Sequence, residues 1–209
     1  MEKCMNEFPH IGIAGNIGVG KTTLCEKLSE VFSLQPIYES VIDNPYLEDF
    51  YSDMERWSFN LQIYFLYHRF SNQVKLSNMK KGFIQDRTIY EDREIFARNL
   101  KDSGYMSERD WNTYSELFNN MTSFINEPNL IIYLKANTDT LLTRIENRNR
   151  IYEAKISPEY IHSLNVYYNK WISSLEPENV LIIDTNNFNI FKDFDMLEEI
   201  INLIKKKIV

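Results

Sequence analysis

The chain alternates between short apolar runs and longer segments with helical spacing. The apolar runs are bounded by residues that interrupt regular structure, and they span residues 11–14, 36–39, 82–86, 129–134 and 180–184. Between them, apolar side chains recur every three or four residues in segments 21–32, 44–79, 91–126, 138–175 and 193–208. Short buried strands that alternate with helices predict an α/β fold, with a five-stranded parallel sheet and helices on both faces.

The ends of the predicted strands carry most of the notable polar groups. In a parallel sheet of this kind, ligands bind beyond the carboxyl ends of the strands. A glycine-rich loop follows the first strand, Glu39 ends the second, Asp86 and Arg87 end the third, and Lys135 follows the fourth. We expect the first three groups to form one site. No repeat or Pro/Gly/Ser-rich linker divides the sequence, so residues 1–209 are expected to form a single domain.

Composition narrows the class of protein. The 209 residues carry 23 Lys and Arg against 30 Asp and Glu, a net charge of −7. This balance disfavours nucleic acid or an anionic membrane surface as a partner, because such partners normally bind a basic face. No apolar stretch approaches the roughly 18 residues that a membrane span needs, and the first ten residues hold no apolar run typical of a secretory signal. The use of only Cys4 and Cys25 fits a reducing compartment, so we expect a cytoplasmic protein.

Glycines gather at one place. Four of the six glycines fall between residues 12 and 20, and three of these lie within the segment Gly15-Asn16-Ile17-Gly18-Val19-Gly20-Lys21-Thr22-Thr23. A strand precedes this G-x-x-x-x-G-K-T pattern and a helix follows it, which is the context of a phosphate-binding P-loop. We expect its amide groups to surround the phosphates of ATP, Lys21 to reach the β- and γ-phosphates, and Thr22 to ligate Mg²⁺. The alternative is a glycine-rich turn that binds nothing.

Asp86 ends an apolar strand beside this loop. A carboxylate in that position is well placed to contact Mg²⁺, directly or through water. Taken alone, an aspartate at a strand end more often caps a turn or helix. The intact P-loop favours the metal role.

The P-loop predicts that a nucleotide binds but not what happens to it. A GTPase would carry an Asn-Lys-x-Asp base reader, whereas Asn169 and Lys170 are followed by Trp171 and Ile172. The sensor segments of a motor ATPase are also missing. Phosphoryl transfer to a small acceptor remains, and it requires an acceptor pocket.

A long helix supplies candidates for that pocket. Residues 55–79 contain no Gly or Pro, and a core stripe is predicted at spacings of three and four: Phe59, Ile63, Leu66, Phe70 and Val74. Gln62 and Arg69 are two turns apart and therefore share another face. A glutamine amide matches the N6/N7 edge of adenine or the N3/N4 edge of cytosine. Alternatively, both side chains are simply solvated.

Two further groups complete the candidate site. Asp92 and Phe96 are one turn apart, so Asp92 could pair with Arg69 and Phe96 could stack on a flat ring; otherwise they are a surface aspartate and a core phenylalanine. Three arginines fall within seven residues, at positions 144, 148 and 150. They suit a lid that closes over a triphosphate, although such a run commonly forms a solvated helix face.

Together these motifs resemble the deoxynucleoside kinase family, and most closely its bacterial deoxyadenosine/deoxyguanosine kinase branch. The resemblance covers nearly the whole chain and rests on GNIGVGKTT, IYESVIDNPYLEDFY, ERWSFNLQIYFLYHRF, IQDRTIYEDREIF and RIENRNRIYEAKISPEY. It implies the P-loop kinase fold with an arginine-rich lid at about residues 144–156. The implied reaction is ATP- and Mg²⁺-dependent phosphorylation of a 2′-deoxynucleoside at its 5′-hydroxyl, and the implied assembly is a homodimer.

The resemblance also implies roles for individual residues. At the 5′ end, Glu39 would help to remove the hydroxyl proton, Asp86 would serve Mg²⁺ or accept that proton itself, and Arg87 would hold the 5′-oxygen and phosphate. Tyr51 and Glu153 would bind the sugar 3′-hydroxyl. Gln62 would read the base between Trp57 and Phe96, and Arg69 with Asp92 would tune base choice. Arg144, Arg148 and Arg150 would be the lid arginines.

The chain departs from the family pattern at two positions. Asn149 stands where the lid often has Gly, and Ser40 stands where many members have Pro or Asp. The first affects the expected lid geometry, and the second affects only a loop.

Some choices stay open at this level. A purine deoxynucleoside is favoured, deoxycytidine is possible, and thymidine fits less well. The competing hypotheses are a thymidylate-kinase-like nucleotide kinase and a non-catalytic nucleotide-binding subunit. The first would need a cation, not Glu39, at the acceptor's 5′ end, and the second is disfavoured by the intact Lys21, Thr22, Asp86 and Arg87.

Overall fold

Five parallel strands form the centre of the molecule. The computed structural model describes residues 9–38, 44–77, 81–190 and 192–208. The strand order is β2-β3-β1-β4-β5, and every neighbouring pair is parallel. The strands are β1 His10–Gly15, β2 Gln35–Ile37, β3 Phe83–Asp86, β4 Leu130–Lys135 and β5 Val180–Asp184. The predicted α/β class and its five-stranded parallel sheet are therefore confirmed.

The strand pairing explains where the site lies. All six residues of β1 are buried, because the strand lies between β3 and β4 and has helices on both faces. Ile13 pairs with Asp86, so the P-loop after β1 and the Asp86-Arg87 pair after β3 emerge side by side. The second predicted strand included Glu39, but β2 ends at Ile37, and Glu39 and Ser40 lie outside the described residues.

Helices fill the long segments between the strands, but three predicted segments are divided. The helices are α1 Lys21–Phe32, α2 Leu47–Ser52, α3 Met54–Ser77, α4 Ile89–Glu91, the π-helical η1 Asp92–Ala97, α5 Arg98–Asp102, α6 Glu108–Thr122, α7 Thr138–Arg148, the 3-10 turns η2 Ile151–Lys155 and η3 Pro177–Asn179, α8 Pro158–Ile172, and α9 Phe194–Ile208. Gly104, at φ +80°, separates α5 from α6. Asn149, in the left-handed region, ends α7, and Ser157 caps α8 with Pro158 at its first position.

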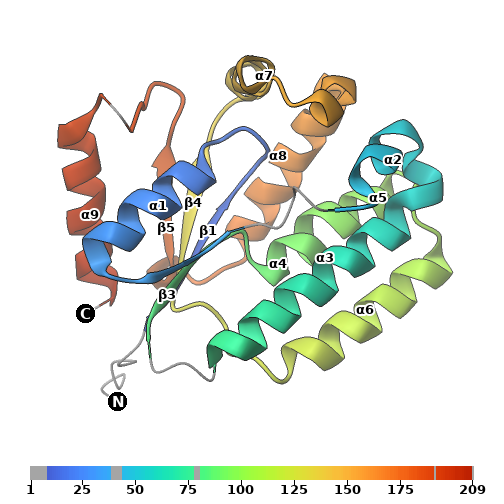
Figure 1. Cartoon of the computed structure of the whole chain (residues 1–209), viewed down its shortest axis with the longest axis horizontal. Helices are drawn as coiled ribbons and strands as arrows, with labels where there is room; N and C mark the ends of the chain where they lie inside the picture. Colours follow the sequence, from blue (N-terminus) through green and yellow to red (C-terminus); the bar gives the residue numbers. More distant parts are fainter. Residues whose placement is uncertain (1–8, 39–43, 78–80, 191, 209) are drawn as a thin grey trace.

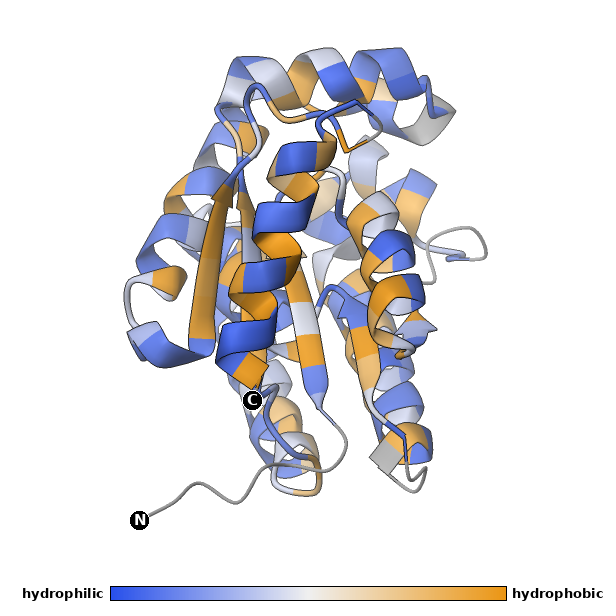
Figure 2. Cartoon of the chain, turned by 90° about the vertical axis from the view of Figure 1, so that its left-hand side faces the viewer, coloured by the Kyte–Doolittle hydropathy of each residue, from blue (hydrophilic) through white to orange (hydrophobic). Residues whose placement is uncertain are grey.

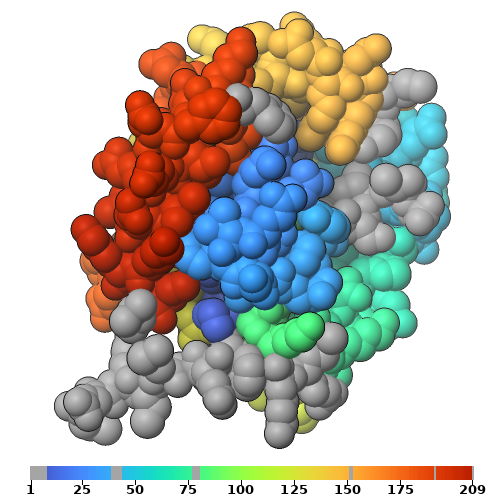
Figure 3. All heavy atoms as spheres, turned by 60° about the vertical axis from the view of Figure 1, so that its left-hand side comes forward, coloured from blue at the N-terminus to red at the C-terminus, as the bar shows by residue number. Residues whose placement is uncertain are grey.

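The helices cover the two faces of the sheet unequally. Figures 1 and 3 show α1 and α9 side by side on one face. The other face carries α4, η1 and α8, with α3 and α6 farther out (Figure 1). Figure 2 shows the largely apolar strands behind α9, whose residues alternate between polar and apolar colours. No helix in the ranges that the structure describes is long and apolar enough to cross a membrane.

The buried face of α3 differs from the predicted core stripe. Of the predicted stripe, Leu66 is 1% exposed and Val74 is 36% exposed, while Phe59, Ile63 and Phe70 are only partly buried. The face that is buried includes polar side chains, namely Ser58, Gln62, Arg69 and Gln73. The prediction of the stripe was wrong at Val74, whereas Leu66 lies in the core and Phe59, Ile63 and Phe70 pack against it. Of the buried polar side chains, Gln62 lines the cavity described below.

A buried histidine at the start of β1 gives the fold a pH-dependent stability. The ring of His10 stacks on Phe83 with centroids 4.1 Å apart, and its Nε2 lies 3.2 Å from Gln85 Oε1. Burial lowers the pKa of His10 from 6.5 to about 4. Between these values the unfolded chain binds a proton that the folded chain does not, so stability is lost as the pH falls through this window.

We expect protonation of His10 to lower the free energy of unfolding by about 3 kcal/mol between pH 7 and pH 4. The measurement is urea unfolding of the wild type and of His10→Phe, which keeps a stacking ring but cannot titrate, at pH 7 and at pH 4. The wild type should lose more unfolding free energy than the variant. Equal losses in the two proteins would contradict the prediction.

Candidate active site

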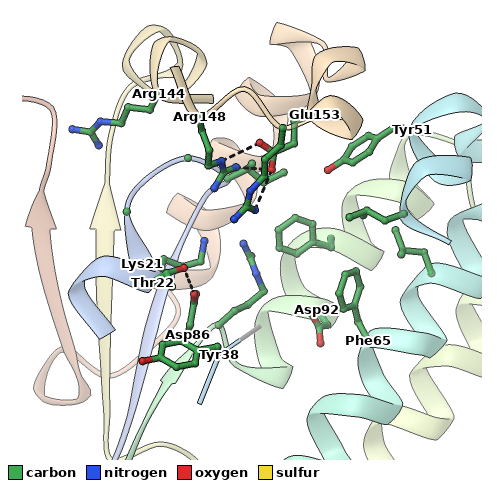
Figure 4. Close-up of a pocket in the computed structure, with 18 of the residues that line it drawn as sticks. Lys21, Thr22, Tyr38, Tyr51, Phe65, Asp86, Asp92, Arg144, Arg148 and Glu153 are labelled. Atoms are coloured by element: carbon green, nitrogen blue, oxygen red, sulfur yellow. Dashed lines mark hydrogen bonds and ion pairs between the residues drawn. The ribbon is translucent and has the colours of Figure 1, made fainter. Parts of the chain in front are cut away.

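One large cavity opens at the carboxyl ends of β1 and β3. Its volume is about 570 Å³, and its walls come from the P-loop, α2, α3, the end of β3, η1 and the α7–η2 segment. It brings together most of the predicted site residues: Ile17, Gly18, Gly20, Lys21, Thr22, Thr23, Tyr51, Gln62, Asp86, Arg87, Asp92, Phe96, Arg144, Arg148, Arg150 and Glu153. Groups that are up to 136 positions apart in the sequence therefore share one space (Figure 4).

The P-loop has the backbone geometry of a phosphate cradle. Gly18 and Gly20 have φ values of +82° and +102°, which favour glycine. A Cβ on Gly18 would lie 2.9 Å from Ile145, so the loop also packs closely on α7. Lys21 begins α1, is buried, and donates from Nζ to the Asn16 carbonyl at 3.1 Å. An ammonium group and a helix N-terminus thus meet at one end of the cavity, which favours an anionic ligand.

Asn16 shapes this loop without lining the cavity. Its side-chain nitrogen donates to the Ile161 carbonyl and to Asn165 Oδ1, both at 2.9 Å, and its Oδ1 accepts from the Ile17 amide at 2.7 Å. These bonds tie the P-loop to α8. Gly15 and Val19 also belong to the loop, and neither is among the described residues that line the cavity.

Thr22 and Asp86 are arranged as a metal site would require. The Thr22 hydroxyl donates to Asp86 Oδ2 at 2.5 Å (Figure 4). Asp86 Oδ1 is buried and has no hydrogen-bond partner within the described part of the chain, and such an atom calls for a ligand. A hydroxyl and a carboxylate oxygen suit Mg²⁺, which keeps several waters and phosphate oxygens in its shell. In keeping with this, the described residues contain no cluster of three or more His, Cys, Asp or Glu that could hold a metal alone.

Arg87 is held in an unusual backbone conformation. Its φ is +69°, a value that non-glycine residues rarely adopt. Its amide donates to the Ile13 carbonyl at 3.0 Å, and its own carbonyl accepts from Arg69 Nη1 at 3.2 Å. Its guanidinium lies 4.4 Å from the centroid of Phe96. This strained position at the cavity is compatible with a functional role.

The opposite end of the cavity has side chains that can hydrogen-bond to a flat polar ring. Gln62 is 2% exposed, and its Oε1 has no hydrogen-bond partner among the described residues. Arg69 Nε donates to Asp92 Oδ2 at 2.6 Å, and both side chains are buried, so the predicted ion pair is confirmed. Arg69 itself lines a smaller adjoining chamber. A buried amide oxygen that lacks a partner is expected to acquire one from a ligand.

Trp57 does not belong to this wall, contrary to the expectation from the resemblance. Of the described residues that line the cavity, Phe65 supplies the aromatic ring beside Gln62 on α3 (Figure 4). Trp57 instead packs against Tyr46 and beneath the guanidinium of Arg56. Helical geometry explains the difference, because Trp57 is five residues from Gln62 and Phe65 only three, so only Phe65 shares its face.

All three lid arginines line the cavity, but only two of them pair with Glu153. Arg148 donates to Glu153 from Nη2 and Nε at 2.5 and 3.1 Å, and Arg150 Nη1 lies 3.7 Å from the same carboxylate. Arg144 reaches Thr185 and the Val19 carbonyl, and Figure 4 shows it directed away from Arg148 and Glu153. Tyr51, on α2, points its hydroxyl toward Glu153 across the cavity (Figure 4).

Asn149 preserves the turn that its position requires. It has φ +49° and ψ +45°, and its amide donates to the carbonyls of Ile145 and Glu146. Asparagine tolerates this left-handed conformation better than most residues other than glycine. The departure from the family pattern is therefore compatible with the turn that glycine would make.

Sequence reasoning missed several residues of the site. Phe50, Phe65 and Tyr160 line the cavity, and Glu91 and Tyr168 lie directly behind Arg87. Phe65 could have been found from its spacing to Gln62. No local signal pointed to Tyr168, because it is 81 positions from Arg87.

Comparison with known proteins decides the family. A model of the deoxynucleoside kinase family matches residues 11–209. The chain belongs to the deoxynucleoside kinase family. It is 41% identical over 196 residues to a deoxyadenosine/deoxycytidine kinase of Bacillus subtilis, covering 93% of this chain and 90% of the relative. To a deoxyguanosine kinase of the same organism it is 38% identical, covering 98% and 100%.

Solved structures agree with this assignment. The deoxyadenosine kinase of M. mycoides with bound dATP has a TM-score of 0.81 to this kinase at 29% identity, covering 93% of this chain and 99% of that one. The same enzyme with its products dCMP and dCDP has a TM-score of 0.82, covering 92% and 98%. The kinase is accordingly an enzyme that phosphorylates deoxynucleosides with ATP.

Proposed function

We propose that this kinase transfers the γ-phosphoryl group of ATP to the 5′-hydroxyl of a purine 2′-deoxynucleoside in nucleotide salvage. The observation that carries the proposal is the different chemistry of the two ends of the cavity. Asp86 and Arg87 lie at the end beside the P-loop, and Gln62, with its buried and unpartnered Oε1, lies at the other. An uncharged sugar–base molecule would then present its primary alcohol to the phosphate cradle.

Phosphoryl transfer in this site would depend mainly on positioning and charge neutralisation. The transition state is loose and carries charge on the transferred group, so cations directed at it accelerate the reaction. Lys21, Arg148 and Arg150 line the triphosphate side, and Arg87 lines the acceptor side. We propose a closing lid at about residues 144–156, in which Arg148 and Arg150 exchange Glu153 for phosphate oxygens. Arg144, which already contacts Thr185, would hold α7 and the P-loop together beside the ATP.

Mg²⁺ would be held by Thr22 and Asp86. The unpartnered Asp86 Oδ1 and its neighbouring hydroxyl supply oxygen donors of the right kind. When bound with ATP, the ion would neutralise charge on the β- and γ-phosphates.

The proton of the 5′-hydroxyl needs an acceptor, and two carboxylates remain candidates. Asp86 lines the cavity, whereas Glu39, proposed from the family resemblance, lies outside the described residues. General-base catalysis adds a factor on the order of 10²–10⁴. Arg87 would hold the same oxygen, and Tyr51 with Glu153 would bind the sugar 3′-hydroxyl.

Base choice would be read by Gln62 with the Arg69–Asp92 pair. A glutamine amide can donate and accept side by side along the N6/N7 edge of adenine, and Phe65 and Phe96 would bound the ring. The relatives named above act on deoxyadenosine, deoxycytidine or deoxyguanosine, which supports a base other than thymine.

A panel of acceptors tests this proposal. We expect ADP release with Mg²⁺, ATP and deoxyadenosine or deoxyguanosine, a smaller kcat/KM with deoxycytidine, and the smallest with thymidine. A thymidylate-kinase-like enzyme would instead respond to dAMP or dTMP. Preference for a monophosphate acceptor would contradict the proposal.

We further propose a cytoplasmic homodimer. The apolar side chains on the outer faces of α3 and α6 support this assembly, because Tyr67 is 57% and Phe124, just beyond α6, is 77% exposed. A mass in solution of about twice the chain's 25.0 kDa is the expected result of light scattering, and a monomer would refute it. The buried thiol of Cys25 fits a reducing compartment.

A further inference from the structure

Glu91 is a fully buried carboxylate that lies behind the cavity. Its side chain is 0% exposed, and it is not part of the cavity wall in the described structure. One oxygen, Oε2, accepts from the Thr88 amide at 2.8 Å and from the Thr88 hydroxyl at 3.3 Å. The bond from the Thr88 amide is one half of a capping box at the start of α4, and in the other half the Thr88 side chain accepts from the Glu91 amide. Helix capping explains the hydrogen bonds of Oε2 but not those of the other oxygen, Oε1.

The second oxygen of Glu91 connects three distant parts of the chain. Oε1 accepts from the amide of Gly15, the first glycine of the P-loop, at 3.2 Å. It lies 2.8 Å from the Tyr168 hydroxyl and 3.5 Å from Arg87 Nη1. The P-loop, α8 and the end of β3 therefore meet at a single carboxylate oxygen.

Tyr168 is the counterpart of Glu91 in this cluster. Its hydroxyl accepts from Arg87 Nη1 at 2.6 Å and lies 2.9 Å from the Gly15 carbonyl as well as close to Glu91. Its ring is fully buried and stacks on Tyr133 with an interplanar angle of 15°. The hydroxyl is thus fixed by a rigid support, and the same two residues, Glu91 and Tyr168, contact both Arg87 and Gly15.

We propose that Glu91 and Tyr168 are positioning residues that hold the Arg87 guanidinium in a fixed place beside the P-loop. The inference deepens the proposed function and rests on it, since Arg87 is assigned there to the 5′-oxygen. The backbone of Arg87 is strained, at φ +69°. The direction of its guanidinium is set by the Tyr168 and Glu91 side chains that it contacts. A catalytic group displaced by about 1 Å can lose roughly 10²-fold in rate.

The alternative is that both residues only stabilise the fold. A buried ion pair and a buried hydroxyl contribute to stability wherever they occur. The two readings differ in what happens to catalysis when Arg87 is absent.

The first test compares two conservative variants with matched controls. Glu91→Gln and Tyr168→Phe should each lower kcat by about 10- to 100-fold with deoxyadenosine. The KM for deoxyadenosine should change by less than about threefold, because Gln62 and the Arg69–Asp92 pair are untouched. The controls are Glu94→Gln on η1, a partly exposed carboxylate paired with Arg93, and Tyr167→Phe on α8, whose hydroxyl binds Asp102 at the surface. Both controls should keep wild-type kcat.

The second test repeats both variants in an Arg87→Ala background. If Glu91 and Tyr168 act through Arg87, each should then lower kcat by less than about twofold more. Full additivity, or a single-variant kcat within about twofold of the wild type, would overturn the inference. Should Glu91→Gln fail to fold, Tyr168→Phe decides the matter, because it removes one oxygen and keeps the stacked ring. A wild type without activity on any deoxynucleoside would refute the proposed function instead.

Discussion

Replacing Asp86 with asparagine is expected to lower kcat by about three orders of magnitude at saturating ATP and deoxyadenosine. The variant keeps an oxygen that can accept from Thr22 but loses the negative charge that faces the cavity. Whether Asp86 serves Mg²⁺ or accepts the proton, that charge is required. The measurement is steady-state ADP release.

A surface aspartate provides the control for this result. Asp102→Asn removes a carboxylate at the end of α5 that binds Tyr167 and does not line the cavity. It should leave kcat unchanged. A kcat for Asp86→Asn within about threefold of the wild type would remove Asp86 from the mechanism.

The same variant separates the two roles proposed for Asp86. If it holds Mg²⁺, Asp86→Asn should need a higher Mg²⁺ concentration for half-maximal activity, and part of the lost rate should return at high Mg²⁺. If it is the proton acceptor, Mg²⁺ will not restore the rate, and Glu39→Gln will be the milder variant.

Replacing Gln62 with leucine is expected to lower kcat/KM for deoxyadenosine by roughly 100-fold. Two hydrogen bonds to the base would be lost, and each contributes about 0.5–1.5 kcal/mol, with a further cost for leaving the base edge unpaired. Leucine fills a similar volume, so the helix itself should be little disturbed. The measurement is a nucleoside titration at saturating ATP.

Gln73→Leu is the matched control on the same helix. Gln73 is also 2% exposed, but it donates to the Asn126 carbonyl at 2.9 Å and lies outside the cavity wall in the described structure. Its replacement should lower the unfolding free energy and leave the nucleoside KM unchanged. Equal losses of kcat/KM in the two variants would show that Gln62 is only structural.

The sequence predicts those parts of this enzyme that depend on local pattern. The strands, the P-loop and the Asp86-Arg87 pair are recognisable because each depends on the types of a few consecutive residues. The possible pairing of Arg69 with Asp92 was also recognisable, because residue spacing placed each of them on a defined face of its helix. In these cases the local preference and the tertiary structure agree.

The failures share a physical cause, which is that burial depends on the whole fold. Helix α3 buries Gln62 in the cavity wall, Arg69 against Asp92 and Gln73 against the Asn126 carbonyl, whereas Val74 of its predicted stripe is 36% exposed. Trp57 was assigned to the site by resemblance although helical geometry turns it away from Gln62. The cluster of Glu91 and Tyr168 spans 77 positions and arises only when α8 packs on η1.

Identification of the phosphorylated product tests the central claim most directly. The wild-type enzyme would be incubated with Mg²⁺, ATP and deoxyadenosine, and the position of the new phosphate would be read from its coupling to the sugar protons in ³¹P NMR. We expect a single product, phosphorylated at the 5′-oxygen, from an unphosphorylated nucleoside. Phosphate at the 3′-oxygen, or turnover only when the acceptor already carries a phosphate, would contradict it.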